Sequence, residues 1–247
     1  MKVVLLLSIF LSSLVLGQNQ PAIKNLRLIP LGQMPVWKDE LIDGVRVEVP
    51  PPPGSYPPKE ITLPDGMKKN GVQTTPLSLG VMSKNLRLDG KIPSLQFHDG
   101  KEVVGQPWLT APVHKSDMTL GVLFRDQVAM TWLKPRILLL DDSQKDFPPG
   151  NIRFVNVANH TALVKFGAGS KAIKPGDSLM LPLKVGDNVL TIGYIDKDSG
   201  NPVMINKALA VRVMANQRIQ SFFYQNQDKA ADRQLLFKWH PEPPPAL

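Results

Sequence analysis

The sequence predicts an all-β protein of the sandwich class. Beyond residue 150, short stretches of alternating apolar and polar residues recur at a spacing of roughly 8–12 residues, which is typical of strands with one buried face. Glycine, proline, aspartate and asparagine cluster between these stretches and favour tight turns. No stretch in this region keeps the apolar period of about 3.6 residues that an amphipathic helix needs.

The predicted strands of the C-terminal region follow one another with turn residues between them. Ile152–Val157 is rich in β-branched and aromatic residues, and Ala162–Phe166 places alternate apolar side chains on one face. Further strands are expected at 189–195, 209–213, 219–224 and 235–239. The core of this unit is expected to consist of Ile152, Phe154, Val164, Phe166, Val189, Ile195, Leu209, Val211, Val213, Ile219, Phe223 and Phe237.

Residues 1–17 have the layout of a secretory signal peptide. Lys2 precedes an apolar stretch, and the small residues Val15 and Gly17 suit the −3 and −1 positions of a cleavage site. The stretch is shorter than the about 20 apolar residues of a membrane-spanning helix, and polar residues follow it. We therefore expect cleavage after Gly17, no transmembrane segment in the mature chain, and a secreted or periplasmic location.

The chain has 247 residues and no cysteine. This composition excludes disulfide scaffolds, thiolate metal sites, iron–sulfur clusters and cysteine nucleophiles. An exported chain without disulfides must be stabilised by its core alone, and a chain of this length can bury enough surface for that. The combination favours a bacterial periplasmic or surface protein.

The region 18–75 is expected to be extended and rich in proline, with one strand near 44–49. Gly44–Val49 alternates strictly and places Val45, Val47 and Val49 on one side. The prolines of residues 50–58 cannot enter the interior of a sheet, so they predict a strap or spacer. We expect the strand to pair at an edge of the main sheet. The alternative is that it pairs with another molecule, as a donated strand does.

Residues 76–146 contain further short apolar segments with less regular alternation. This β-rich block forms either a composite sandwich with residues 147–240 or a separate lobe that leans on them. The proline-rich residues 241–247 are expected to form an extended tail.

The segment Phe147–Val157, followed by Ala162–Phe166 and then Lys174–Asp177, resembles secreted bacterial immunoglobulin-like modules of unknown function. In those modules a strand similar to Ile152–Asn156 opens a sandwich, and a Pro-Gly turn follows the next hairpin. The resemblance covers about residues 147–226. It implies an immunoglobulin-like sandwich and export, and it implies no catalytic residue.

The basic residues outnumber the acidic ones, 29 to 21, but they are scattered along the chain. Scattered charge indicates a solubilising surface, and it leaves an envelope protein or an anionic polysaccharide as partners. Nucleic-acid binding would need a basic stripe with interleaved aromatic residues, which the sequence lacks.

Motifs of hydrolases and nucleotide-binding proteins are missing. The chain has no Gly-x-Ser-x-Gly elbow, and Gly167–Lys171 lacks the spacing of a phosphate loop, so we expect a hairpin turn there. Asp141 and Asp142 are adjacent on an extended chain and must point in opposite directions, unlike the facing pair of a glycosidase. They predict a solvated strand end.

The candidate metal ligands form only partial sets. His98-Asp99 and His114 with Asp117 supply two ligands each, and exposed loop histidines explain them more simply. Residues 196–201 resemble the start of a calcium loop but lack its distant glutamate, and a hairpin turn explains them equally well. We therefore assign no metal, no cofactor and no catalytic residue.

The aromatic residues are widely spread, with tryptophans at 37, 108, 132 and 239. Phe222–Tyr224 carries rings on both faces, which indicates either a strand buried on both sides or an exposed ring pair. Because no catalytic constellation is visible, we expect an exported, non-catalytic binding or structural module of the bacterial cell envelope. The alternatives are a carbohydrate-binding module, which needs coplanar exposed aromatics, and an unfamiliar hydrolase, which needs converging acid–base groups in a pocket.

Overall fold

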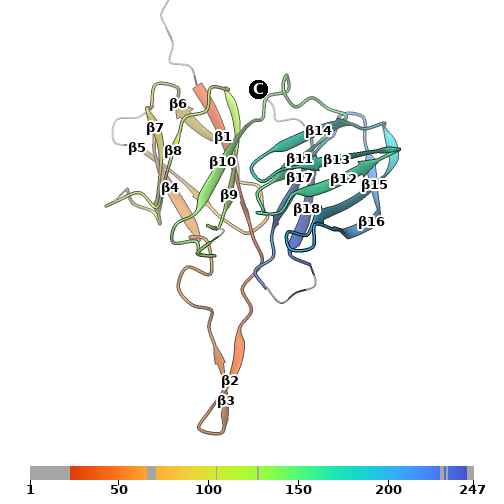
Figure 1. Cartoon of the computed structure of the whole chain (residues 1–247). Coiled ribbons are helices and arrows are strands. Elements are labelled where there is room, and N and C mark those ends of the chain that lie inside the picture. Colours follow the sequence, from red (N-terminus) through yellow and green to blue (C-terminus); the bar gives the residue numbers. More distant parts are fainter. Residues whose placement is uncertain are drawn as a thin grey trace, which may run out of the picture.

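The computed structural model describes residues 23–65, 71–103, 105–126, 128–228, 231 and 233–243. The predicted signal peptide, residues 1–17, lies outside these residues. The regular elements of the described chain are the strands β1–β18, arranged in four four-stranded sheets and one two-stranded hairpin (Figure 1). The predicted all-β class is confirmed. The described residues contain no helix with the length and apolar character needed to cross a bilayer.

The first sandwich is built from eight strands in two sheets. One sheet has the order β10 (Arg136–Asp141), β9 (Met118–Phe124), β1 (Ile23–Leu31) and β6 (Leu86–Asp89), and the other has the order β5 (Gly71–Pro76), β4 (Glu60–Asp65), β7 (Ser94–Asp99) and β8 (Leu109–Pro112). A core that includes Leu28, Leu63 and Phe97 fills the space between the two sheets. The region 18–75, for which one strand is expected, thus supplies β1 and β4 to the middle of these sheets.

The second sandwich also has two four-stranded sheets. One has the order β14 (Ser178–Pro182), β11 (Asn151–Asn156), β17 (Arg218–Gln225) and β18 (Leu235–Glu242), and the other has the order β13 (Gly169–Ile173), β12 (Ala162–Phe166), β15 (Gly186–Ile195) and β16 (Pro202–Val213). Its core contains Phe154, Tyr194 and Phe223. Pro241 and Glu242, expected in an extended tail, end strand β18.

The two sandwiches have the same strand topology. The sheet β6-β1-β9-β10 corresponds to β14-β11-β17-β18, and the sheet β5-β4-β7-β8 corresponds to β13-β12-β15-β16. In each sandwich the first strand runs parallel to the seventh of its eight strands, β1 with β9 and β11 with β17. The chain therefore folds as two copies of one architecture, although the sequence has no exact repeat.

Most of the residues predicted for the second core are buried there. Ile152, Phe154, Val164, Val211, Val213, Ile219 and Phe223 belong to the buried cluster, and Phe166, Leu209 and Phe237 pack against it. The prediction was wrong for Val189, which is 61% exposed, and Ile195 lies outside the cluster. Strand β15 is apolar on both faces and contains an irregularity near Leu190, so its alternation alone does not fix which face is buried.

A third core joins the two sandwiches. It contains Ile29 and Val122 from the first sandwich, and Val155 and Phe222 from the second. Consequently β9 and β17 are buried on both faces. Of the two alternatives expected for Phe222–Tyr224, the structure shows the strand that is buried on both sides and not the exposed ring pair.

A hairpin of β2 (Lys38–Ile42) and β3 (Val45–Val49) projects from the first sandwich (Figure 1). Its two-residue turn, Asp43-Gly44, has positive φ at both positions, which suits the twist of a tight hairpin. The expected pairing of this strand at an edge of the main sheet was wrong, since β3 pairs with β2. The turn folds the strand back on its neighbour in sequence before it can reach a sheet of either sandwich.

The proline-rich residues 50–58 return the chain from the hairpin to β4. Gly54 accepts a hydrogen bond from the backbone N–H of Trp132 at 2.8 Å, and Ser55 accepts one from Arg125. These contacts fix the foot of the hairpin to the loop that connects β9 and β10.

Candidate functional site

The two faces of the hairpin β2–β3 differ in polarity. Directly opposed residues share a face, so Ile42, Val45 and Val47 lie together on one side, which we call the apolar face, and this side also carries Glu40 and Lys38 near the base of the hairpin. The other side carries Asp39 opposite Glu48 and Leu41 opposite Arg46. The apolar face is open to solvent, because Ile42 is 49% exposed, Val45 63% and Val47 40%.

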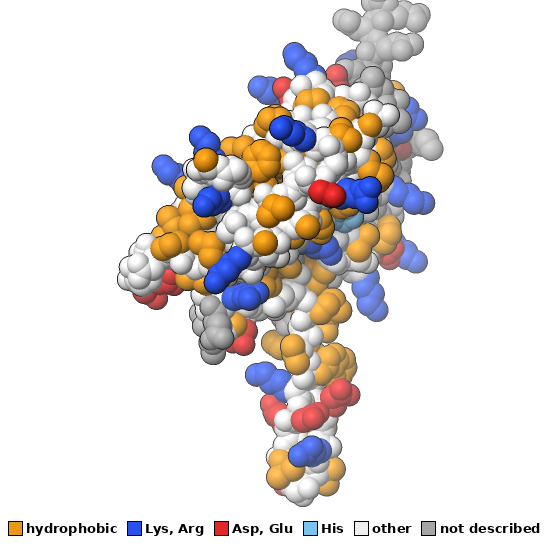
Figure 2. Space-filling view, turned by 90° about the vertical axis from the view of Figure 1, so that its right-hand side faces the viewer, with side chains coloured by type: hydrophobic (Ala, Val, Ile, Leu, Met, Phe, Trp, Pro, Cys, Tyr) orange, Lys and Arg blue, Asp and Glu red, His pale blue; other side chains and the backbone are white. Residues whose placement is uncertain are grey.

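A second group of exposed apolar side chains lies at the foot of the hairpin. Met34, Val36 and Trp37 precede β2 and are 67%, 80% and 50% exposed. Figure 2 shows hydrophobic side chains at the tip and the neck of the projection, with charged side chains between them. A two-stranded hairpin is at best marginally stable in water by itself, and exposed apolar side chains that gather on one projecting element favour an interaction site. This combination identifies the hairpin as a candidate binding element.

The hairpin is acidic, in contrast to the rest of the chain. Residues 38–49 contain four carboxylates and two cations, which gives a net charge of −2, whereas the whole chain carries +8. An acidic element with an apolar face is repelled by anionic lipid surfaces and anionic polymers. Its chemistry suits a protein surface with apolar and basic side chains.

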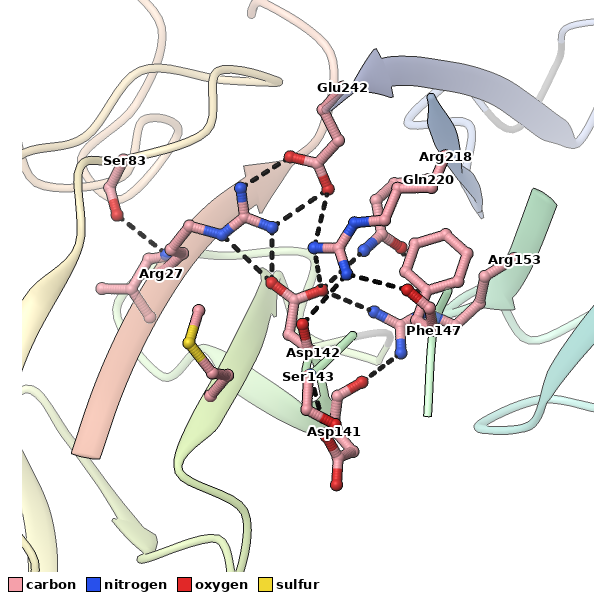
Figure 3. Close-up of polar contacts among 12 residues, drawn as sticks. Arg27, Ser83, Asp141, Asp142, Ser143, Phe147, Arg153, Arg218, Gln220 and Glu242 are labelled. Atoms are coloured by element: carbon pink, nitrogen blue, oxygen red, sulfur yellow. Dashed lines mark hydrogen bonds and ion pairs between the residues drawn. The ribbon is translucent and has the colours of Figure 1, made fainter. Parts of the chain in front are cut away.

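A second polar constellation lies buried where the two sandwiches meet (Figure 3). Asp142 directly follows β10 and is 1% exposed. Its Oδ1 accepts hydrogen bonds from Arg218 Nη2 at 2.8 Å and from Arg153 Nη2 at 3.1 Å, both on strands of the second sandwich. Arg27 on β1 binds the other carboxylate oxygen through its Nε at 3.1 Å.

Glu242 closes this network from the last strand. Its Oε2 lies 2.6 Å from Arg27 Nη1, and its Oε1 lies 3.3 Å from Arg218 Nη2. The ring of Phe147 stacks against two of the guanidinium groups, with its centroid 4.4 Å from Arg153 Cζ and 4.6 Å from Arg218 Cζ. We call Arg27, Asp142, Arg153, Arg218 and Glu242 the ionic junction.

The pKa values of the three arginines indicate that the ionic junction holds the two sandwiches together. Burial lowers the pKa of Arg153 to about 10 and also lowers the pKa of Arg218, while the charge of Asp142 opposes both shifts. At Arg27 burial acts in the same direction, but the hydrogen bonds and charges of Glu242 and Asp142 together outweigh it and raise the pKa. All three guanidiniums thus stay charged at neutral pH and occupy both carboxylates, which leaves neither carboxylate free for acid–base chemistry.

The expectation of a solvated strand end at Asp141-Asp142 was wrong for Asp142. Three arginines from distant positions compensate its burial, and sequence spacing does not reveal them. The expectation that the two carboxylates point apart is confirmed. The carboxylate of Asp141 turns away from the arginines and accepts hydrogen bonds from Ser116 Oγ at 2.8 Å and from the backbone N–H of Ser143 at 2.9 Å, whereas the backbone carbonyl of Asp141 accepts one from Arg153.

Ser116, His114 and Asp141 lie near one another but do not form a catalytic triad. The Ser116 hydroxyl donates to Asp141 directly, and the ring Nδ1 of His114 accepts a bond from the backbone N–H of Ser116 at 3.2 Å. The imidazole therefore does not act on the hydroxyl, as a base in a triad would. The Lys24 ammonium holds this loop through the carbonyl oxygens of residues 114–116.

The candidate metal ligands are not assembled into a site. His98 is 3% exposed on β7, whereas its neighbour Asp99 is exposed, so they lie on opposite faces and the expectation of an exposed loop histidine was wrong here. Asp196 accepts hydrogen bonds from Ser199 in the turn between β15 and β16, which confirms the predicted hairpin turn. Within the described ranges no three His, Asp or Glu residues are grouped to hold a metal ion. Gly167 has positive φ and makes the predicted turn between β12 and β13.

One tryptophan is buried, two are half-buried, and one is exposed at the hairpin. Trp132 is 1% exposed, Trp108 donates its Nε1–H to the carbonyl of Trp132 at 2.7 Å, and Trp239 packs against the second core. Trp37 alone of the four is an exposed side chain, at the foot of the hairpin.

No protein-family model and no curated protein matches the chain. Sequence reasoning identified β3 but missed β2, the strand that completes the candidate binding element. The dipeptide Asp43-Gly44 was the available signal, because it favours a two-residue hairpin between the segments on either side.

Proposed function

We propose that the protein is an exported, non-catalytic binding module of the bacterial cell envelope and that the β2–β3 hairpin is its binding element. The observation that carries the proposal is the solvent-exposed apolar face of Ile42, Val45 and Val47 on a hairpin that projects from the first sandwich. The signal-peptide layout of residues 1–17 supports export. For an exported chain, the lack of cysteine favours a bacterial periplasmic or surface protein over an animal extracellular one.

We further propose that both sandwiches are of the immunoglobulin-like kind, with residues 50–58 as a proline-rich strap at the end of the first. The common topology of two four-stranded sheets, with the first strand parallel to the seventh, supports this assignment. Sandwiches of this kind present loops at their ends for recognition. The hairpin occupies such a loop, between β1 and β4.

The alternatives have less support. A hydrolase needs free acid–base groups in a pocket, but arginines bind Asp142 and Glu242. The Ser116 hydroxyl donates to Asp141, and His114 contacts only the backbone N–H of Ser116. A carbohydrate-binding strip needs several coplanar exposed aromatics, and three of the four tryptophans are buried or half-buried.

The binding proposal is tested by cross-linking the purified protein to an envelope fraction of its source cells. We expect a protein partner whose cross-links map to Lys38 at the foot of the hairpin. The double variant Val45→Thr/Val47→Thr keeps β-branched residues but makes the apolar face polar, so it should abolish these cross-links. The matched control Leu41→Thr changes the opposite face and should retain them. Equal cross-linking by all three proteins would refute the proposal.

Export is tested separately by cell fractionation and N-terminal sequencing. The mature chain is expected outside the cytoplasm and to begin at Gln18. An intact N-terminus in the cytoplasmic fraction would contradict this part of the proposal.

A further inference from the structure

The interface between the two sandwiches ends in a small cavity on the side away from the ionic junction. Alternate residues of a strand share a face. On β17, Arg218 belongs to the ionic junction, Phe222 to the third core, and Tyr224 to the lining of the cavity. On β1, Arg27 and Leu31 mark the same two ends. The cavity therefore lies where the chain leaves β1 toward the hairpin (Figure 1).

The cavity is lined by both sandwiches and by the neck of the hairpin. Its lining includes Gly32, which follows β1, Phe124 and Arg125 at the end of β9, and Tyr224 and Gln227 of the second sandwich. The volume is about 20 Å³, which is the space of one water molecule or one carboxylate oxygen. A protein that contacts the hairpin can therefore place a small polar group here, whereas a larger group does not fit.

Arg125 is the basic group of this cavity, and no carboxylate of the described residues pairs with it. Two of its five N–H groups donate to backbone carbonyls, one to Ser55 and one to Met130 at 3.4 Å. Its Nε–H is buried without a partner. Burial lowers the pKa of Arg125, and no acid opposes this shift, in contrast to the arginines of the ionic junction. The chain thus leaves this half-buried charge uncompensated.

The neighbouring carboxylate, that of Asp126, is used elsewhere. Its Oδ1 accepts hydrogen bonds from the backbone N–H groups of Val128 and Ala129, both at 2.9 Å, and its Oδ2 lies 3.0 Å from Arg136 Nε. The turn that Asp126 caps ends at Met130, which also lines the cavity and has a φ of 52°. Non-glycine residues rarely adopt this conformation, and such strain is concentrated at functional sites.

The hydroxyl of Tyr224 is a second unused donor in the lining. It makes no hydrogen bond to the described residues, and burial raises the pKa of Tyr224, so the phenol stays protonated at neutral pH. A guanidinium and a phenol O–H form charge-assisted hydrogen bonds with carboxylate oxygens, whereas Arg125 would repel a cation. The donor set therefore selects an anion.

We infer that Arg125 and Tyr224 form a subsite at the foot of the hairpin, and that this subsite binds a carboxylate of the protein held by the hairpin. The inference rests on the proposed function, because it adds a chemical requirement to the partner of the hairpin. The acidic hairpin faces apolar and basic groups of that partner, and the basic foot receives one carboxylate. A chain terminus and an aspartate or glutamate side chain both supply this group.

Three small probes test the subsite on the full chain. N-acetyl-leucine carries a terminal carboxylate, the α-amide of N-acetyl-aspartate carries a side-chain carboxylate, and N-acetyl-leucinamide carries none. Ligand-observed NMR titrations should show millimolar binding of at least one carboxylate probe and at least about tenfold weaker binding of N-acetyl-leucinamide, because the amide lacks the charge-assisted bonds. The carboxylate probe with the higher affinity identifies the source of the group.

Variants assign the binding to the two residues. Arg125→Gln removes the charge and should abolish binding of the carboxylate probe, and Tyr224→Phe removes only the hydroxyl and should weaken it by about fivefold. Arg212→Gln is the matched control, since Arg212 is an exposed arginine that forms no ion pair with the described residues, and it should bind as the wild type does.

Tyr224→Phe keeps the ring that packs against the third core, so it remains informative even where Arg125→Gln does not fold. Failure of the wild type to bind either carboxylate probe would overturn the inference. Equal affinity of the wild type and Tyr224→Phe, or of the wild type and a folded Arg125→Gln, would also overturn it.

The failure of this inference differs from the failure of the proposed function. Cross-links that are lost in Val45→Thr/Val47→Thr, together with no binding of either carboxylate probe, would overturn the subsite and leave the hairpin as the binding element. Cross-links that are unaffected by that double variant would overturn the proposed function, and with it the assignment of the carboxylate to the partner of the hairpin.

Discussion

The guanidinium of Arg27, on the first strand of the first sandwich, lies 2.6 Å from the carboxylate of Glu242, on the last strand of the second. This ion pair connects the beginning and the end of the described chain. It adjoins Asp142, which directly follows the last strand of the first sandwich, so both sandwiches and the segment between them meet in one buried network. We therefore expect the two sandwiches to unfold together, since separating them would expose the arginines and the third core.

Asp142→Asn should strongly destabilise the protein. The substitution removes the charge that compensates three buried arginines, and breaking a buried ion pair in this way costs about 3–5 kcal/mol. The measurement is urea-induced unfolding followed by tryptophan fluorescence. Asp126→Asn is the control, because its partner Arg136 is 57% exposed and solvent screens that pair. Similar losses for both variants would contradict a special role of the ionic junction.

Asp141→Asn should change how stability depends on pH. Burial disfavours the ionised carboxylate, but hydrogen bonds from Ser143 and Ser116 outweigh it and lower the pKa of Asp141 to about 2. An unfolded aspartate titrates near 3.9, so the contribution of Asp141 is complete above about pH 4 and is lost as the pH falls toward 2.

The free energy of unfolding of Asp141→Asn should therefore fall less steeply between pH 4 and pH 2 than that of the wild type. Urea titrations at a series of pH values measure both slopes. Parallel curves for the two proteins would show that Asp141 ionises equally easily in the folded and unfolded chains.

Val211→Asp should unfold the second sandwich. Val211 is fully buried in its core, so an aspartate there would be an unpaired buried charge, and a loss of roughly 4–5 kcal/mol or more is expected. Arg212→Asp is the matched control, because the adjacent side chain points to solvent. Circular dichroism during heating distinguishes the two; a cooperative transition of Val211→Asp at the wild-type temperature would refute the core assignment.

Replacing residues 38–49 by a short Gly-Ser turn should leave the melting temperature almost unchanged. The hairpin contributes no residue to the three cores, so its removal exposes little buried apolar surface. Leu28→Ala is the contrasting variant, because Leu28 is fully buried and the cavity should cost about 2–5 kcal/mol. Calorimetry compares them, and a large decrease for the hairpin replacement would mean that the projection stabilises the body.

The strands beyond residue 150 could be predicted because most have one buried and one exposed face. The alternation fails where both faces are buried, and for that reason β1 and β9 gave no clear signal. The prediction of which side of β15 faces the core was wrong for a related reason. Val189 and Leu190 are both apolar, so the sequence does not show that Leu190 is the buried one and Val189 the exposed one.

The candidate site was predictable to the extent that its signals are local. The apolar side of β3 follows from Val45, Val47 and Val49, but β2 is mostly charged and resembles no half-buried strand. The ionic junction depends on the meeting of Asp142 with Arg218 of the second sandwich, which is 76 positions away in the chain. Such a meeting depends on the packing of the two sandwiches, which local patterns do not encode.

The common topology of the two sandwiches makes the hairpin a modular insertion. The loop between β1 and β4 spans residues 32–59, whereas the corresponding loop between β11 and β12 spans only residues 157–161. The first sandwich thus carries an arm at a position where the second has a short connection. The short loop 157–161 is therefore a suitable site for an insertion. Transferring residues 32–59 into it would give a molecule with two hairpins, so that one chain could bind two partners at once.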